Sequence, residues 1–227
     1  EACENCWLAA MEYRFRPHLY VTHNVDTGRE QFTGIIQTRP DRLDIPLKTK
    51  KPTIYSVWSD LFHEKVPASF IIEVFERMEY CKQHTFLICT KRPERIESVL
   101  YGQEGNFYLG GGDYIPNVWF GTTIENQKYI ERIMVLEQID YFKKFISFEP
   151  LLSAINYTFH DGINWVIVGA ESGHNHRECK IEWVESIVEQ CKDAGVPVFV
   201  KQLHINGKLV KDINQFPEHL RIRERPF

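Results

Sequence analysis

Polar and charged side chains follow six short apolar runs of this chain, each at the point where the run ends. They supply carboxylates, cations and hydroxyls that could bind a charged ligand or move protons. A run that is apolar throughout and then turns polar is typical of a buried parallel strand. In parallel sheets, ligands gather at the carboxyl edge, so we expect these side chains to surround one site. They are Ser59, Asp60, Thr90, Lys91, Arg92, Thr122, Glu125, Asn126, Glu149, Glu171, Ser172, Lys201 and Gln202.

The elements that must position these groups alternate along the chain. The runs are TIYSVWSD, TFLICTKRPE, VWFGTTIEN, FISFEP, WVIVGAES and VFVKQ, and we predict that each contains a strand. Helical patterns separate several of them, as in ASFIIEVFERMEY, ENQKYIERIMVLEQI and IEWVESIVEQCKDAG, the last ending at Gly195. Such alternation predicts right-handed βαβ crossovers and a parallel sheet.

The number of strands bears on whether the sheet closes. A weaker candidate, FTGIIQT at residues 32–38, would make a seventh strand, and the short helical pattern RPDRLDIPLK follows it. The predicted fold is therefore α/β, a parallel (β/α) TIM-like barrel, full or partial, with six to eight strands. A full barrel needs eight strands, so its first strand would have to precede Glu1. We expect one barrel-like domain over residues 1–227, with an irregular C-terminal tail from about residue 203.

Composition is that of an ordinary globular protein, with 43% hydrophobic and 26% charged residues. The net charge of −4 gives no general electrostatic reason to bind a nucleic-acid backbone, although a local basic pocket remains compatible with it. No apolar run is long enough to span a bilayer, and the N-terminus lacks the pattern of a secretion signal. We therefore expect a cytoplasmic protein without membrane partners.

Two of the six cysteines, Cys3 and Cys6, form a C-x-x-C at the start of the chain. In a reducing cytosol such a pair suits metal or redox chemistry better than a structural disulfide. With His18 and His23 it reads C-x2-C-x11-H-x4-H, close to the spacing of a structural zinc site. Pro17 and the extended pattern YVTHNV argue against that alternative, because finger histidines share one helix face. The remaining cysteines are interpreted as small core residues.

Several stretches together resemble a known family. They are CENCWLAAM, SVWSDLFHEKVP, HTFLICTKRPER, PNVWFGTTIENQ, FISFEPLL, WVIVGAESG and VPVFVKQL, in that order. They resemble a phage- and prophage-associated family of uncharacterised proteins with a three-cysteine motif, which is itself similar to radical S-adenosylmethionine (radical SAM) enzymes. Cys3 and Cys6 match the last two cysteines of that motif, Trp7 stands where Tyr is usual, and Ala170 stands where a second Gly is usual. The first cysteine of the motif is not in the chain, which begins with Glu rather than Met, so we expect a native segment upstream that carries it.

The resemblance implies two cofactors, a 4Fe-4S cluster and S-adenosylmethionine, and an enzyme that cleaves the latter to modify a substrate. Cys3 and Cys6 would be metal ligands. Ser59 and Asp60 would accept from the methionyl ammonium, and Lys91 or Arg92 would pair with its carboxylate. Glu125 or Glu149 would bind ribose hydroxyls, and Thr90 and Asn126 complete the predicted cofactor-binding set, whereas the substrate would meet Glu171, Ser172, Arg177, Lys201 and Gln202.

Other classes stay open. The chain could be a non-catalytic accessory or binding barrel of a phage, or a protein with the structural zinc site described above. The substrate of an enzyme is not identified by the residues: a nucleobase and a protein are both conceivable in a phage setting, and the charge balance supports neither. Serine-hydrolase and Rossmann chemistry are excluded, because the chain has neither G-x-S-x-G nor a G-x-G-x-x-G between a strand and a helix.

Overall fold

The computed structural model describes residues 6–15, 19–57, 59–102, 115–140, 142–173 and 175–227. Its centre is a seven-stranded sheet of order β3-β4-β5-β6-β7-β8-β9. The strands are β3 (Ile54–Val57), β4 (Thr85–Thr90), β5 (Val118–Thr123), β6 (Lys143–Phe148), β7 (Trp165–Gly169), β8 (Val198–Ile205) and β9 (Lys208–Val210). Neighbours from β3 to β8 pair in parallel, and only β9 is antiparallel. All six strands predicted from the apolar runs are thus confirmed.

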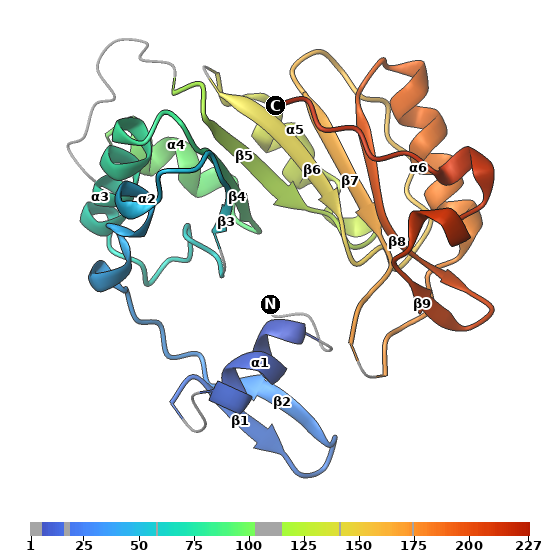
Figure 1. Cartoon of the computed structure of the whole chain (residues 1–227), viewed down its shortest axis with the longest axis horizontal. Coiled ribbons are helices and arrows are strands. Elements are labelled where there is room, and N and C mark those ends of the chain that lie inside the picture. The colour runs from blue at the N-terminus through green and yellow to red at the C-terminus, as the bar shows by residue number, and fades with distance from the viewer. Residues whose placement is uncertain (1–5, 16–18, 58, 103–114, 141, 174) are drawn as a thin grey trace.

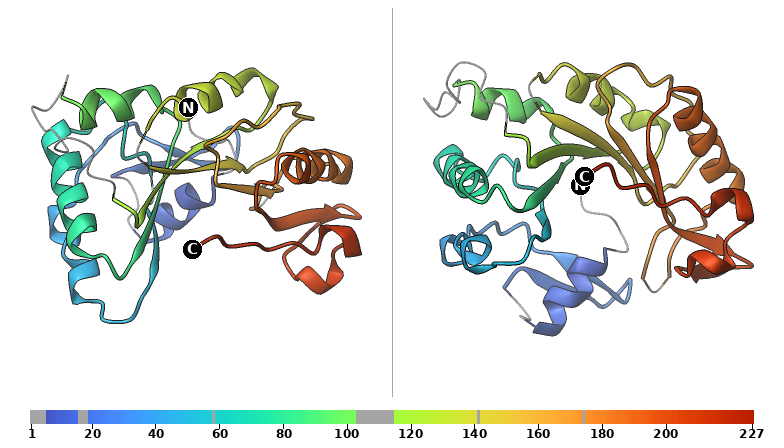
Figure 2. Two further views of the ribbon diagram at one scale, coloured as in Figure 1. Left: turned by 90° about the horizontal axis from the view of Figure 1, so that it is seen from above. Right: turned by 45° about the horizontal axis from the view of Figure 1, so that its top comes forward.

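Helices cover the convex face of this sheet (Figures 1 and 2). They are α3 (Ala68–Tyr80), α4 (Glu94–Leu100), α5 (Glu131–Glu137) and α6 (Ile181–Asp193). In α3 the buried side chains Ile71, Val74, Phe75 and Met78 recur at three- and four-residue spacing, as predicted. Helix α6 ends before Gly195, whose φ of +65° is a conformation that glycine adopts without strain.

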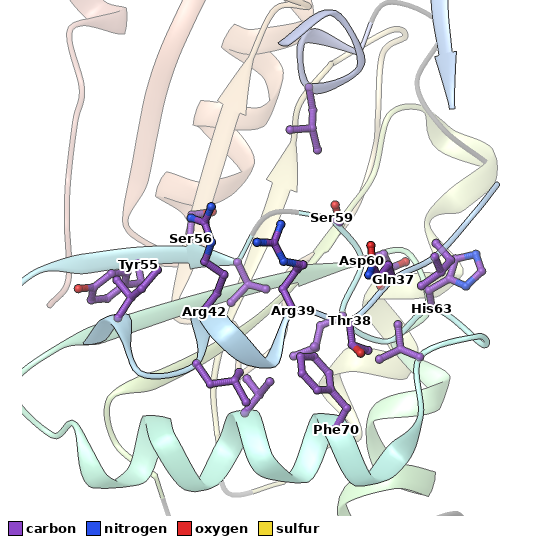
Figure 3. A pocket seen from close by; sticks show the side chains of 18 of the residues that line it. Gln37, Thr38, Arg39, Arg42, Tyr55, Ser56, Ser59, Asp60, His63 and Phe70 are labelled. Carbon is purple, nitrogen blue, oxygen red and sulfur yellow. The ribbon is translucent and has the colours of Figure 1, made fainter. Parts of the chain in front are cut away.

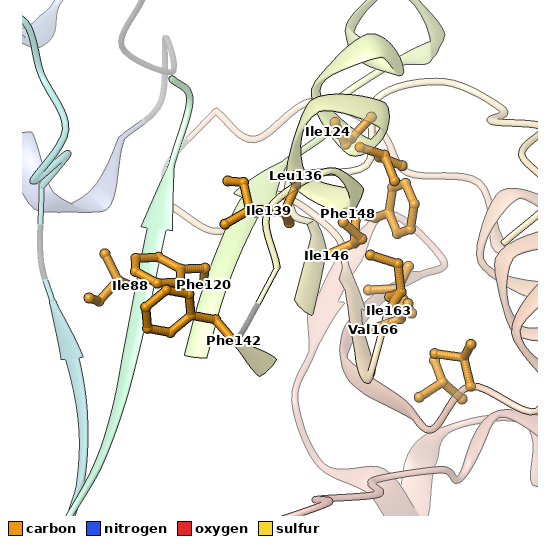
Figure 4. Close-up of a cluster of buried hydrophobic side chains, with 14 of the residues drawn as sticks. Ile88, Phe120, Ile124, Leu136, Ile139, Phe142, Ile146, Phe148, Ile163 and Val166 are labelled. Carbon is orange, nitrogen blue, oxygen red and sulfur yellow. The ribbon is translucent and has the colours of Figure 1, made fainter. Parts of the chain in front are cut away.

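The two faces of the sheet bury different side chains because successive residues of a strand point to opposite sides. The face under the helices carries aliphatic and phenylalanine side chains, among them Ile88, Phe120, Ile146 and Val166, in one large cluster (Figure 4). A second cluster of Trp119, Phe145 and Trp165 is separate from it. It belongs to the opposite, concave face, where the alternate residues of β5, β6 and β7 lie.

The sheet curls but is not shown to be a closed barrel. Strands β3 and β9 are its two ends, and no described strand pairs them with each other. In Figure 1 the ribbon forms an open half-barrel whose gap is faced by the N-terminal elements. Of the two predicted forms, the full and the partial (β/α) barrel, the partial barrel agrees with this topology.

The N-terminal elements are helix α1 (Trp7–Phe15) and a separate antiparallel hairpin of β1 (Val21–Asn24) and β2 (Arg29–Phe32). The start of α1 faces the side of the sheet on which the carboxyl ends of the strands lie (Figure 1). The predicted strand at residues 32–38 is wrong, because β2 ends at Phe32 and Gly34 has a φ of +78°. This segment instead leads to the short helices η1 (Pro40–Arg42) and α2 (Ile45–Lys48), where a helical pattern was expected.

The C-terminal tail is more ordered than predicted. It contains the end of β8, β9, and the 3-10 helices η4 (Ile213–Gln215) and η5 (Glu218–Leu220). Beyond them, Val200 N donates to Ile222 O and Glu224 N donates to Val198 O, so the tail extends the sheet along β8. The indole of Trp165 donates to Glu224 O at 2.9 Å, and the Phe227 ring contacts Trp119 and Trp165. The difference from the predicted irregular tail arises because the polar sequence of this segment carries no pattern that predicts these backbone contacts.

In the part of the chain that the structure describes, no helix has the length and apolarity needed to cross a membrane.

Candidate functional site

The carboxyl ends of β3 and β4 are joined by Asp60. Its carboxylate accepts from Thr90 Oγ1 at 2.6 Å, from Arg92 Nη1 at 2.7 Å and from the backbone N–H of Phe62 at 3.1 Å. Arg92 N in turn donates to Thr90 Oγ1 at 3.0 Å. Charge-assisted bonds of this kind fix the side chains at the end of β4. Asp60, Thr90 and Arg92, three of the predicted cofactor-binding residues, therefore lie together.

The ends of β4 and β5 are joined by Glu125, which is only 4% exposed. It forms ion pairs with Lys91 and with Arg132 of α5, whose Nη1 is 3.3 Å from Glu125 Oε2. Arg132 also donates to Thr123 O at 3.0 Å and lies over the Tyr129 ring. A buried carboxylate between two cations is compensated, as burial requires. Sequence reasoning missed Arg132, because it lies on a helix and not at a strand end.

The third ion pair, between Glu149 and Lys201, reaches across strand β7. Lys201 Nζ of β8 lies 2.8 and 2.9 Å from the two carboxylate oxygens of Glu149, which follows β6. Strand β7 lies between them, and its residue there is Gly169. A Cβ at Gly169 would stand 3.4 Å from Lys201 Cβ and from Gln202 Cγ, so the absent side chain leaves room for this approach. Gln202 Nε2 also reaches Glu149 Oε1 at 3.2 Å and Ala170 O at 2.6 Å.

A fourth acid, Glu171, follows β7 and is 3% exposed. Arg177 binds it with two guanidinium nitrogens, at 3.0 and 2.5 Å, and with its backbone N–H at 2.8 Å. His204 lies beneath, with Nε2 3.2 Å from Glu171 O, while its Nδ1 accepts from Cys179 N at 3.0 Å. Burial, with the nearby His176 ring, lowers the pKa of His204, which favours the neutral ring that these two contacts need.

Four predicted residues take other positions. Thr122 points into the helix-covered layer and donates to Thr90 O at 2.9 Å. The side chain of Asn126 accepts from Lys128 N and caps the 3-10 helix η3 (Gln127–Tyr129). Ser59 is exposed, with a φ of +68°, and Ser172 is half-buried. The structure thus pairs charged members of the predicted site with neighbouring charges along the strand ends, and these four side chains take no part in those ion pairs.

Cysteines divide by environment. Cys6, at the start of α1, is half-buried. Cys81, Cys179 and Cys191 are buried and, as predicted, part of the core. Burial raises the pKa of Cys89 to about 12, with the nearby Asp60 and Glu125 carboxylates adding to this, so that thiol is not a ready thiolate.

The predicted metal ligands lie at the N-terminus of the chain. Cys3 and His18 lie outside the described residues. Among the described residues, no three or more His, Cys, Asp or Glu side chains are grouped so that they could hold a metal ion. His23 lies on β1, where its Nδ1 is 3.4 Å from Glu30 Oε1 and its ring is near Tyr13. The extended conformation expected for this histidine is confirmed, and the zinc alternative stays a prediction.

Together, the contacts form a charged edge, defined here as Asp60, Lys91, Arg92, Glu125, Arg132, Glu149, Glu171, Arg177 and Lys201. Within it, four carboxylates and five cations are paired at the carboxyl ends of the parallel strands. Comparison with curated proteins and comparison with solved structures each returned no match. The family model DUF5131, described as a protein of unknown function, matches residues 1–215, and the chain therefore belongs to the DUF5131 family.

Proposed function

We propose that this protein is an iron-sulfur enzyme of the radical SAM kind, which cleaves S-adenosylmethionine to modify a substrate. The observation that carries the proposal is the charged edge at the carboxyl ends of β3 to β8. The cysteine-bearing start of α1 faces the same side of the sheet (Figure 1). This arrangement supports a ligand with charges of both signs next to a thiolate-bound group.

The charged edge suits the groups of S-adenosylmethionine by type. Its ammonium needs a carboxylate, for which Asp60 is our candidate, and its carboxylate needs a cation, for which we assign Arg92 or Lys91. Glu125 and Glu149 are the candidates for the ribose hydroxyls. Because these side chains already bind one another, they are held in place before a ligand arrives, which lowers the cost of ordering them.

Iron is the demanding part of the proposal. A 4Fe-4S cluster bound through cysteine thiolates would supply the electron that breaks the carbon–sulfur bond of the sulfonium. Cys6 is the one cysteine of the described residues that combines the C-x-x-C motif with a position outside the core. Cys6 and Cys3 fit two ligands of such a cluster, and a third would have to come from a further thiolate. The resemblance, and not the geometry, is the ground for this cofactor.

The first experiment tests the cluster. The protein is reconstituted anaerobically with iron and sulfide, and bound iron, visible charge-transfer absorption and electron paramagnetic resonance are measured. We expect Cys6→Ser to lose the cluster and Cys191→Ser, in the core of α6, to retain it. Equal iron in both variants, or none in the unchanged protein, would remove the enzyme from consideration.

The second experiment tests the charged edge. Calorimetric titration with S-adenosylmethionine compares the unchanged protein with Asp60→Asn, and with Glu30→Gln in the β1–β2 hairpin as the matched control. We expect a loss of affinity of about tenfold for Asp60→Asn, the effect of one charge-assisted bond. The formation of 5′-deoxyadenosine under reducing conditions is the activity measurement.

The alternative is a non-catalytic binding barrel. It is favoured by one observation, that every carboxylate of the charged edge has a cation partner within the chain. Such pairs are satisfied without any ligand. A protein that binds neither iron nor S-adenosylmethionine, and whose stability falls when Glu149 or Lys201 is replaced, would fit this function. The substrate of an enzyme stays open between a nucleobase and a protein, as the resemblance to a phage-associated family implies.

A further inference from the structure

Four aromatic side chains lie together on the concave face, at the amino ends of the strands. The ring centroid of Trp165 lies 6.3 Å from that of Trp119 and 6.1 Å from that of Phe199. The Phe227 ring contacts both tryptophans, at 5.5 and 5.2 Å. The tryptophans are buried, whereas Phe199 is half-buried and Phe227 is 40% exposed. The two phenylalanine rings therefore form the accessible part of this aromatic group.

Positive side chains flank the rings. Lys143 Nζ of β6 lies 5.0 Å from the ring centroid of Trp119. The guanidinium carbons of Arg223 and Arg225 lie 5.5 and 5.4 Å from the ring centroid of Phe199. Both arginines belong to the tail that pairs with β8 and that crosses the concave side of the sheet in Figure 1. Cations thus lie at both ends of the series of rings that runs from β5 to β8.

Two of these three cations have no recorded polar partner. Arg223 holds the tail in place, because its guanidinium donates to three backbone oxygens of β8 and of the segment after β9, at 3.3, 3.1 and 2.7 Å. For Lys143 and Arg225, the described residues provide ring contacts but neither a recorded hydrogen bond nor an ion pair. Packing of the tail therefore explains Arg223 but leaves the charges of the other two unanswered.

The acids near these cations are engaged elsewhere or remote from them. Glu224 accepts from Val198 N through Oε2 at 2.7 Å. Asp140, in the loop before β6, acts on Lys144, which lies on the helix-covered face. Asp161, in the loop before β7, is exposed, and no ion pair between it and either cation is recorded among the described residues. No described acid thus neutralises the cations beside the rings.

Charge is also distributed unevenly along the chain. Residues 198–227 contain six lysines and arginines against three acids, whereas the whole chain has a net charge of −4. Elsewhere cations have acids beside them: Arg39 and Arg42, which line a cavity beside β3 (Figure 3), share Asp41 at 2.7 and 3.7 Å. The cations beside the aromatic rings lack such an acid, so an anion from outside the protein can answer their charge.

Accessible rings between cations are suited to a single strand of nucleic acid, because phosphates pair with the cations and bases stack on the rings. We propose that this basic aromatic face, defined as Lys143, Arg225, Trp119, Trp165, Phe199 and Phe227, binds single-stranded nucleic acid. Its phosphates contact Lys143 and Arg225, and its bases stack on the two phenylalanine rings. The face lies at the amino ends of the strands, opposite the charged edge, so this inference does not depend on the proposed enzyme.

The test measures fluorescence polarisation of a fluorescein-labelled oligothymidylate of about twelve nucleotides, a length within the usual site sizes for single strands. We expect saturable binding by the full chain at low salt. Lys143→Gln and Arg225→Gln should each weaken binding roughly three- to tenfold and each reduce the slope of log affinity against log salt by about 0.7. Lys192→Gln, which removes one charge from an exposed position of α6, is the matched control and should change neither quantity.

Base stacking is tested without any change in the protein. An abasic oligomer of equal length keeps the phosphates but loses the bases, and it should bind about tenfold more weakly, the effect of one stacked base. A duplex of equal length hides its base faces and should also bind more weakly. Binding of either oligothymidylate or oligouridylate supports the proposal, and the tighter of the two identifies the sugar of the strand.

Four results would overturn the proposal. They are no saturable binding by the unchanged protein at about 50 mM salt, undiminished binding by folded Arg225→Gln and Lys143→Gln, equal affinity for the abasic oligomer, and tighter binding of the duplex. Equal affinity for polyglutamate of the same charge would assign the face to acidic peptides and would likewise overturn it. Circular dichroism of each variant verifies that it is folded.

Discussion

Replacing Gly121 with alanine tests the close packing of β5 on β6 at the concave face. A Cβ built on Gly121 would stand 2.3 to 2.5 Å from three atoms of the Phe145 ring. Carbon atoms in contact are normally about 3.5–4.0 Å apart, so the ring would have to move by more than about 1 Å. Phe145 is 3% exposed and packs against Trp165, with 6.0 Å between ring centroids, so a shift of its ring would disturb that contact.

Overpacking of a tight core costs about 1–3 kcal/mol, and the contact with three ring atoms places Gly121→Ala near the upper end. In a protein of this size that corresponds to a fall in Tm of roughly 5–10 °C. Guanidinium unfolding followed by tryptophan fluorescence is the assay, because Trp119 and Trp165 adjoin the site of the change. A second substitution, Phe145→Leu, makes the neighbouring side chain smaller and completes a double-mutant cycle with Gly121→Ala.

In Gly121→Ala/Phe145→Leu the smaller side chain should absorb the added methyl, so the loss should be less than the sum of the two single losses. The reasoning is refuted if Gly121→Ala changes the free energy of unfolding by less than about 0.5 kcal/mol, the scale of ordinary surface changes. Strict additivity of the two substitutions would refute it as well, since it would show that the methyl and the ring do not meet.

Three further predictions concern buried polar groups. Glu125→Gln should lower the free energy of unfolding, measured by denaturant titration, by about 2–3 kcal/mol. This loss is smaller than that expected for a fully buried ion pair, because the partners Lys91 and Arg132 are partly exposed. The pKa of His204 is lowered by burial, so the unfolded chain takes up a proton first and the stability should fall as pH drops below about 6.5. His204→Gln should flatten this part of the curve when the denaturant titration is repeated across pH. The pKa of Lys144 is lowered by burial, so its positive charge opposes folding at pH 7, and the stability should rise as pH approaches about 10.5. Lys144→Met should be at least as stable as the unchanged protein at pH 7 and should show no such rise, as measured by thermal unfolding at both pH values.

Strands β3 to β8 could be predicted because each contains a short apolar run, whereas the three-residue strand β9 was not predicted. In β5 every residue is buried, which no surface element would show. The extended segment at β1 was expected, but β2 and its pairing with β1 were not predicted, because the residues VTHN and REQF are mostly polar and half-buried or exposed. Ile35 and Ile36 led to the wrong strand prediction, since they are apolar but 54% and 40% exposed, and they line a cavity beside β3 instead of pairing in a sheet.

The charged residues of the site could be predicted, but their partners could not. Strand-end position identified Asp60 and Glu149, because parallel strands bring their carboxyl ends to one edge. The pairing of Glu149 with Lys201 across β7 depends on the strand order and on the absent side chain of Gly169. Arg132 reaches Glu125 from a helix, so its place in the network follows from packing and not from any local pattern.

The pairing within the charged edge narrows the kind of ligand that can bind there. A ligand with a single charge would take one partner from a pair and leave the other charge buried without compensation, which is costly for Glu125 and Glu171 at 4% and 3% exposure. A ligand that carries both an ammonium and a carboxylate can exchange with both members of a pair and leave neither charge unanswered. The Asp60–Arg92 pair, whose side chains are 19% and 26% exposed, is the most accessible place for such an exchange among the pairs that join β3, β4 and β5. Charge pairing and burial at this edge therefore favour a zwitterion, such as the proposed S-adenosylmethionine, over a simple phosphate, independently of the cysteines.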